Sequence, residues 1–322
     1  MDAVDIRILR AMGPFPYAPR ANGSDALRPA RIAREVGLSP ETVRDRIARM
    51  EGTGVIAGYE IVPNLRHLGL SADAFLIRPP DEPHRERLRN SLGLVEGLLE
   101  VTYFLGTEAC VDLSFQTPGQ RATRLRALAE ASGDPSPLPF LGWRMPAVER
   151  SLSHLDWRIV RALRGRAKRS LVEVAEELGV GYRTVKRHYD RMAEEGSFFV
   201  KPLLNPAAEP GVVPFVLLFF FEDPADRQAP GRILRALDEH VVFAHPPASL
   251  QAGNFDVLVF ASSAMDVERL RQKGAAVPGV TRVQALVLTD VDSRMDWIDE
   301  LLDAKLAAAA AASGSGAPDP AR

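Results

Sequence analysis

The sequence predicts an α+β protein in which two kinds of unit alternate and each occurs twice. Three observations support this prediction. A set of three amphipathic helical segments occurs near the start of the chain and again near its middle. Each set is followed by the order strand, helix, strand, strand, helix, strand. The chain has 322 residues, enough for several domains with their own cores.

The most informative segment is 170–196. Leu171 and Val174 share one face of a predicted helix, and Gly179 ends it because glycine adopts the left-handed C-cap conformation without steric cost. A second helix follows at 182–195, with apolar residues on one side and basic residues on the others. Two short helices joined by a glycine turn, the second of them basic, are typical of a helix-turn-helix. A solvated helical hairpin is the alternative.

The flanking residues complete this unit, and the first half repeats it. An amphipathic helix is predicted at 154–163 and a wing-like strand at 197–204. The segments 5–12, 32–37 and 42–54 carry the same pattern in the first half.

A loop is expected at 13–29, which is rich in proline, glycine and asparagine. Its Arg20 and Arg28 either touch a phosphate backbone or belong to an ordinary surface loop.

Three motifs of the second copy carry a family resemblance. They are D-x-R-I-x-x-A-L from Asp156, A-x-x-L-G-V from Ala175 and T-V-K-R-H-x-x-R-M-x-x-x-G from Thr184. Together they resemble the DNA-binding domain of the leucine-responsive/asparagine-regulator (Lrp/AsnC) transcription factors over about fifty residues. The resemblance implies winged helix-turn-helix domains, each followed by a ferredoxin-like domain that oligomerises and senses small molecules. Because both halves show the pattern, the chain resembles two family subunits fused in tandem.

These patterns divide the chain into five segments. Winged helix-turn-helix domains are predicted at 1–63 and 151–205, ferredoxin-like (βαββαβ) sensing domains at 64–150 and 206–292, and a C-terminal helix with a disordered tail at 293–322. The strands predicted in the sensing domains are 70–77, 100–105, 109–115 and 140–145, then 212–221, 241–244, 255–261 and 280–289. The helices predicted between them are 83–92, 118–131, 229–240 and 265–276.

DNA contact needs a helix that fits the major groove, with cations for phosphates and polar groups for base edges. Arg183 and Arg187 are four residues apart on one helix face and are expected to read neighbouring bases. The first copy has Glu41 and Asp45 in that region, so the second copy is expected to bind DNA better. The candidate DNA-binding residues are Tyr182, Arg183, Thr184, Lys186, Arg187, His188 and Arg191, with Thr42, Arg44, Arg46 and Arg49 in the first copy.

A candidate effector site follows from the same resemblance. The family has a G-x-[YF]-D turn between the second and third strands of its sensing domain, which helps to form an amino-acid site. Gly253, Phe255 and Asp256 match this turn, with the glycine allowing close backbone approach and the aspartate meeting an ammonium group. A hairpin turn with a solvated aspartate is an equal alternative. In the first copy only Gly106 and Asp112 remain.

The competing class is an enzyme, since siroheme decarboxylases have the same architecture as paired or fused halves. Their signature places Tyr, Arg and His close together before an Asn-x-Trp-Phe run. Here Tyr103 is present without the histidine and arginine, so the expected proton donors are missing. His245 is interpreted as structural. We therefore expect a regulator, with no enzyme activity and no cofactor; a scaffold that has lost DNA contact is a third interpretation.

Composition and charge limit which binding sites and which cellular location are expected. The net charge is −2, so DNA contact must come from local basic surface. Cys110 is the one cysteine, so no disulfide can form within the chain, and no Cys/His cluster has the spacing of a zinc site. Cys110 is expected to be buried. The acids at 290–300 are interpreted as a helix start in preference to a cation site. No apolar run is long enough for a membrane span and 1–10 lacks a signal pattern, so a cytoplasmic location is expected.

The expected assembly also follows from the family, whose sensing domains pair through their sheets. The segments 70–145 and 212–289 are therefore expected to pack together within one chain as a pseudo-dimer. Covalent linkage favours this pairing over association with another chain. The expected partners are double-stranded DNA and an amino-acid-like effector, and the sequence leaves a homo-oligomer open.

Overall fold

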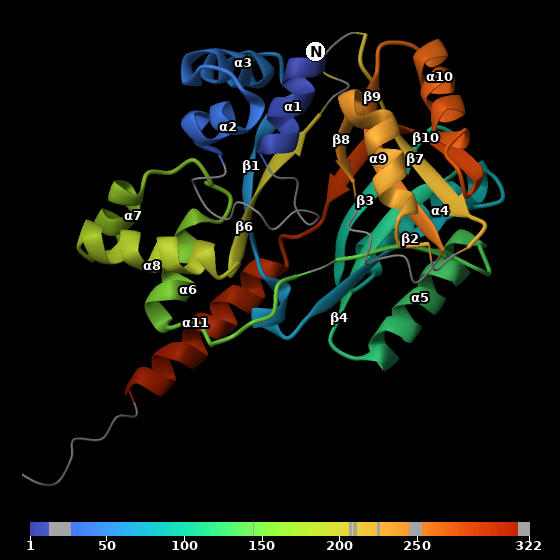
Figure 1. The fold of residues 1–322 in the computed structure, drawn as a ribbon. Coiled ribbons are helices and arrows are strands. Elements are labelled where there is room, and N and C mark those ends of the chain that lie inside the picture. Colours follow the sequence, from blue (N-terminus) through green and yellow to red (C-terminus); the bar gives the residue numbers. More distant parts are fainter. Residues whose placement is uncertain are drawn as a thin grey trace, which may run out of the picture.

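The computed structural model describes residues 1–12, 27–143, 145–205, 208, 211–223, 226–244 and 253–314. Figure 1 shows two groups of helices on one side of the molecule and a large sheet with its own helices on the other. The first set comprises α1 (Ala3–Ala11), α2 (Pro29–Val36) and α3 (Pro40–Gly52). The second comprises α6 (His154–Leu163), α7 (Leu171–Leu178) and α8 (Tyr182–Glu194). The chain is thus of the predicted α+β class.

Local sequence sets the helix boundaries in both sets. Ser170 caps α7 and accepts a hydrogen bond from the backbone of Glu173, whose carboxylate in turn accepts from the backbone of Ser170. Gly37 and Gly179 end α2 and α7 with φ angles of 71° and 64°, a left-handed conformation that favours glycine. The predicted role of Gly179 as a C-cap is therefore confirmed. Ser39 caps α3 and is followed by a proline at the first helical position.

The strand after each helical set has its partner in the other set. β1 (Ile56–Pro63) pairs antiparallel with β6 (Phe198–Leu204), and Glu60 lies opposite Lys201. The wing-like strand predicted at 197–204 is present as β6, but its hydrogen-bonded partner belongs to the other helical set. The two three-helix sets are therefore joined by a two-stranded sheet.

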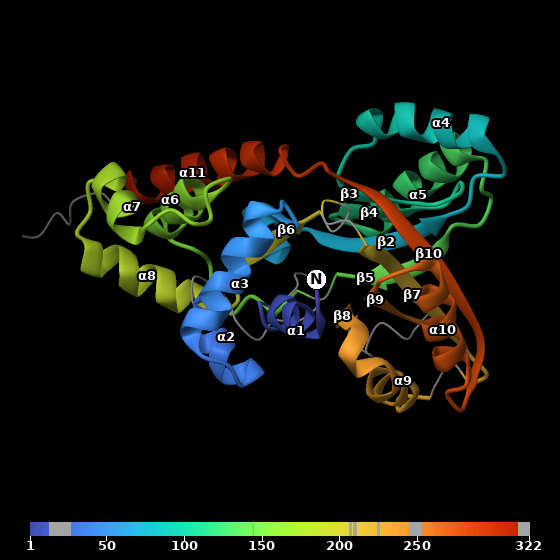
Figure 2. The same cartoon turned by 90° about the horizontal axis from the view of Figure 1, so that it is seen from above.

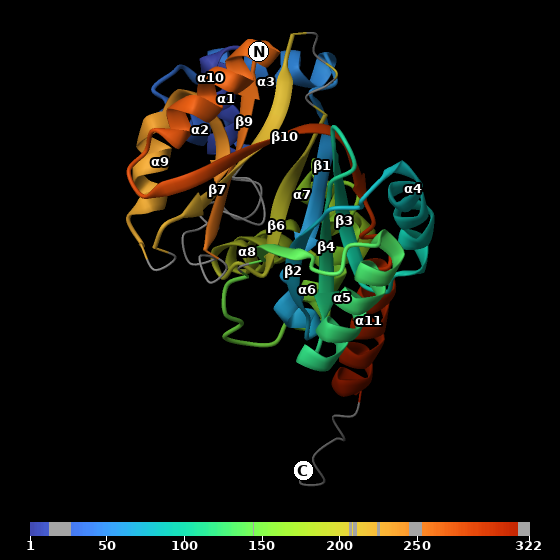
Figure 3. The same cartoon turned by 90° about the vertical axis from the view of Figure 1, so that its right-hand side faces the viewer.

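A second sheet contains eight strands in the order β5-β2-β4-β3-β10-β7-β9-β8. The first four strands are β2 (Ser71–Ile77), β3 (Leu98–Phe104), β4 (Ala109–Phe115) and β5 (Leu138–Gly142). The others are β7 (Val213–Phe221), β8 (Val241–Ala244), β9 (Asn254–Ala261) and β10 (Val280–Ser293). β10 joins the two halves, because its first part pairs with β7 and its last part with β3 (Figure 3).

Two helices cover the outer face of each half of this sheet. α4 (Glu82–Ser91) and α5 (Pro118–Ser132) bury Leu88 and Leu128 against β2, β3 and β4. α9 (Ala229–Leu237) and α10 (Ala264–Ala275) bury Ile233 and Leu270 against β7 and β9. The inner faces share one continuous apolar core with both three-helix sets. This shared core fixes the helical sets against the sheet.

The last helix is α11 (Ile298–Gly314), which packs along α6 (Figure 2). It begins later than the predicted residue 293 because β10 continues to Ser293 to pair with β3. No helix within the described ranges is long and apolar enough to cross a bilayer.

Candidate nucleic-acid interface

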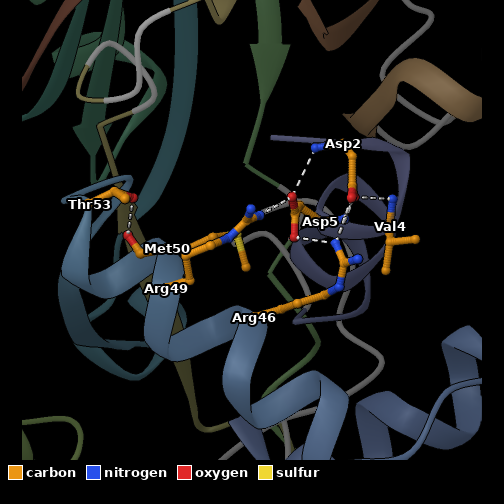
Figure 4. Close-up of polar contacts among 7 residues, drawn as sticks. All are labelled: Asp2, Val4, Asp5, Arg46, Arg49, Met50 and Thr53. Carbon is orange, nitrogen blue, oxygen red and sulfur yellow. Dashed lines mark hydrogen bonds and ion pairs between the residues drawn. The ribbon is translucent and has the colours of Figure 1, made fainter.

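The first three-helix set is held together by a buried acid near the start of α1. Asp5 is fully buried, and its carboxylate accepts a hydrogen bond from the backbone N–H of Asp2 at 2.9 Å. Arg46 of α3 donates to Asp5 at 3.0 Å and to Asp2 at 2.8 Å, and Arg49 also donates to Asp5 (Figure 4). Burial opposes ionisation of Asp2, but hydrogen bonds from Arg46 and from backbone amides outweigh it and lower its pKa to about 2.

The second set has the same arrangement at corresponding positions. Asp156 of α6 is 1% exposed and accepts from the backbone of Ser153 at 2.8 Å. His188 Nδ1 lies 2.7 Å from Asp156 Oδ1, and Arg191 Nη2 donates to the same oxygen at 2.6 Å. Four predicted DNA-binding residues, two on each third helix, therefore hold that helix against its first helix.

The leading part of α8 is more open. Tyr182 is 46% exposed, and Arg183 and Arg187 are exposed. Lys186 forms an ion pair with Asp190, which raises the pKa of Lys186, while Thr184 is half-buried. Within the ranges that the structure describes, Arg183 and Arg187 have no ion-pair partner.

The corresponding part of α3 carries the opposite charge at two positions. Glu41, Arg44 and Asp45 are exposed. The hydroxyl of Thr42 lies 2.9 Å from Ser39 Oγ, so Thr42 belongs to the helix cap. Arg44 corresponds to Lys186 but is followed four residues later by alanine in place of Asp190.

Both helical sets are docked onto the rest of the molecule through corresponding arginines. Arg10 of α1 donates to the carbonyl oxygen of Val241 at 2.8 Å and to Asp238 at 2.7 Å, at the edge of the sheet. Arg161 of α6 donates to Asp303 of α11 at 2.8 Å. The orientation of each set therefore depends on the C-terminal half of the chain.

The predicted effector residues do not lie together on a turn. Gly253 has a left-handed φ of 68°, which fits a turn. Phe255 and Asp256 instead belong to strand β9 and are 1% and 2% exposed, so the alternative of a hairpin turn with a solvated aspartate is wrong, while the effector site itself stays a prediction. Asp256 lies opposite Leu218 of β7, on the inner face of the sheet.

A buried polar cluster lies near Asp256, and no motif in the sequence predicts it. Asp112 of β4 accepts a hydrogen bond from Trp143 Nε1 at 2.9 Å. Burial raises the pKa of Asp112 to about 7, and the carboxylates of Glu100 and Asp256 contribute to the rise. Lys201 of β6 donates to Glu100 of β3, so the cluster connects the two sheets.

The charges in this cluster partly compensate one another. Burial opposes the charge on Lys201, but Glu100 and Glu60 outweigh it and raise the pKa of Lys201. Arg164 forms an ion pair with Glu60 at 2.8 Å. Cys110 is buried as predicted, and burial raises the pKa of its thiol. Only the alternation of polar and apolar residues in β4 could have suggested this cluster, because its members come from strands far apart in the chain.

Two further sequence candidates, Arg20 and His245, lie outside the described residues. Tyr103 is buried on β3, and the guanidinium of Arg89 lies 4.6 Å from the centre of its ring.

Comparison with protein families identifies the second helical set. Residues 152–196 match a family model described as winged helix-turn-helix DNA-binding. The chain carries a winged helix-turn-helix domain. A transcriptional regulator, Ptr1 of Methanocaldococcus jannaschii, is 33% identical over 76 residues. That match covers 24% of this chain and 45% of the relative, so the chain spans less than half the length of this curated relative.

Solved structures resemble a larger part of the chain. The crystal structure of the siroheme decarboxylase NirDL matches with a TM-score of 0.55 and 13% identity, covering 97% of this chain and 100% of that one. At this identity the likeness shows the fold alone. The structure of AsnC from E. coli matches 44% of this chain and 94% of its own, with 19% identity and a TM-score of 0.35.

Proposed function

We propose that this protein is a sequence-specific DNA-binding transcription regulator of the Lrp/AsnC type in a tandem, fused form. The proposal rests on a difference between the basic side chains of α8: some are bound by an acid within the protein, and others are exposed without one among the described residues. His188 and Arg191 are held by Asp156 and fix the helix, while Arg183 and Arg187 extend from it without an ion-pair partner in the described structure. Free arginines on an exposed helix suit the hydrogen-bond acceptors in the major groove.

The strand pairings support a pseudo-dimer within one chain. β1 pairs with β6 between the helical sets, and β3 pairs with β10 between the halves of the large sheet. These contacts favour an approximate two-fold relation between two helix-turn-helix units, which in a single-copy regulator requires a second chain. One chain would then bind two adjacent half-sites.

A small-molecule effector is part of the proposal. Asp256 and Asp112 both lie on inner faces of the large sheet, so an amino-acid effector would reach them only when the interior of the molecule opens. Calorimetry with the twenty amino acids tests this directly. Binding that Asp256→Asn abolishes supports it, whereas heat that is unchanged in Asp256→Asn contradicts it.

The experiment for the main proposal is selection of genomic DNA fragments by the purified protein. Repeated recovery of the same short sequences supports a regulator. Uniform recovery of all fragments, or none, contradicts it.

A second candidate is an enzyme of the siroheme decarboxylase type, favoured by two observations. The fold likeness to NirDL covers 97% of the chain, and Asp112, a buried acid with a raised pKa, has the property of a proton donor. Anaerobic incubation with siroheme distinguishes the two candidates. We expect no decarboxylated product; turnover that Asp112→Asn abolishes would replace the regulator by the enzyme.

A further inference from the structure

The two recognition helices can be compared position by position, because the same contacts set the rotation of both. Asp5 holds Arg46 and Arg49 of α3, and Asp156 holds His188 and Arg191 of α8. The members of each held pair are three residues apart, on one face of their helix. Each third helix is thus pinned to its first helix at matching positions, and corresponding residues point to the same side of each unit.

When the two helices are compared at corresponding positions, two exposed positions near their N-terminal ends carry opposite charges. Arg183 of α8 corresponds to Glu41 of α3, and Arg187 corresponds to Asp45; all four residues are exposed. The position between them keeps its charge, with Lys186 in α8 and Arg44 in α3. The inversion is therefore confined to two exposed positions that are four residues apart, on one face of each helix.

Arginine and carboxylate side chains read opposite members of a G·C pair. Arginine donates two hydrogen bonds to the O6 and N7 atoms of guanine, whereas a carboxylate accepts a hydrogen bond from the N4 amino group of cytosine. In a two-fold symmetric site, corresponding positions of the two half-sites carry the same base. Helices with inverted charges require an inverted base pair at those positions.

Acids close to DNA also repel phosphates, and two features of the chain offset this. Arg44 keeps a cation at the position that corresponds to Lys186. Four residues later α3 has alanine where α8 has Asp190, so that position offers Arg44 no acid to pair with. Both helices belong to one chain, so once α8 is bound, α3 is held near the DNA at an effective concentration of about millimolar. A weaker contact by α3 can then still contribute to specificity.

We infer that the protein reads an asymmetric DNA site, in which α8 selects guanine through Arg183 and Arg187 and α3 selects cytosine at the symmetry-related positions through Glu41 and Asp45. This inference rests on the proposed function. It goes beyond it by assigning the base class that each helix recognises.

Selection of binding sites from a random duplex library tests the inference, using the full chain and two double variants. The wild-type protein is expected to select two half-sites that break the two-fold symmetry at the contacted positions. Glu41→Ala with Asp45→Ala is expected to lose the cytosine preference of one half-site and to keep the base preference of the other half-site. Glu41→Arg with Asp45→Arg is expected to convert the selected site towards a palindrome.

The outcomes separate this inference from the proposed function. A palindromic wild-type site, or a site unchanged by both double variants, overturns the asymmetric site and leaves a DNA-binding regulator in place. Absence of any selected site in all three proteins overturns the proposed function itself. A symmetric site produced by the arginine variant alone supports the inference.

Discussion

Arg191 on α8 donates a hydrogen bond to the buried carboxylate of Asp156 on α6, across 2.6 Å. The same carboxylate accepts from the backbone that begins α6, so one acid both caps the first helix and orients the third. Removal of this charge is expected to loosen α8 without touching its DNA-facing residues.

Asp156→Asn is expected to destabilise the protein by about 2–4 kcal/mol, because it breaks a buried ion pair and weakens a helix cap. The shift of the thermal midpoint measures this effect. Asp190→Asn is the matched control, since it removes an acid of the third helix whose ion pair with Lys186 is exposed. Equal midpoints for the two variants would contradict the structural role of Asp156.

The contribution of Asp112 to the stability of the protein is expected to fall as pH rises from 4 to 8. Burial raises the pKa of Asp112 from 3.8 to about 7, so the folded protein holds a proton that the unfolded chain releases within this range. The contribution of this proton to stability is complete below pH 3.8 and is lost as pH rises through 7, with a slope of up to about 1.4 kcal/mol per pH unit.

Asp112→Asn isolates this group from the other acids, because asparagine keeps the size of the side chain and an acceptor for Trp143. Thermal midpoints of both proteins are measured at several pH values. The thermal midpoint of the variant relative to that of wild type should increase as pH rises. A difference that is constant over pH would show that Asp112 titrates as an ordinary acid.

Arg10→Ala is expected to free the first helical set from the edge of the sheet, because its guanidinium hydrogen-bonds Val241 and Asp238. Hydrogen exchange should become faster in α1 and β8 and stay unchanged in α11. Arg161→Ala is the matched comparison and should affect α6 and α11 instead. The same exchange pattern in both variants would contradict separate docking of the two sets.

Most elements follow from local patterns in the sequence, whereas the connections between them do not. Apolar spacing and the caps at Ser39 and Gly179 locate the helices within a few residues, because those signals act over one or two turns. The pairing of Glu60 with Lys201 joins strands far apart in the chain, and a strand pattern does not specify its partner.

In the candidate site, too, the local features follow from the sequence and the long-range contacts do not. The basic face of α8 is visible in the sequence, but the pairing of His188 and Arg191 with Asp156 depends on how α6 crosses α8. The short glycine motif before Asp256 predicts a turn at that residue. The strand that contains Asp256 begins two residues earlier, so the side chain lies inside the molecule.

The measurement that tests the central claim most directly is the affinity for the selected DNA as a function of salt. Wild type should bind more weakly as salt increases, since cations of α8 displace counterions from the phosphates. Arg183→Ala with Arg187→Ala should weaken binding by about 1–3 kcal/mol for each bidentate arginine–guanine pair that the substitutions remove, whereas Arg126→Ala, an exposed arginine on α5, should bind as wild type. Salt-independent binding, or equal affinity of the double variant and the Arg126 control, would contradict DNA recognition by α8.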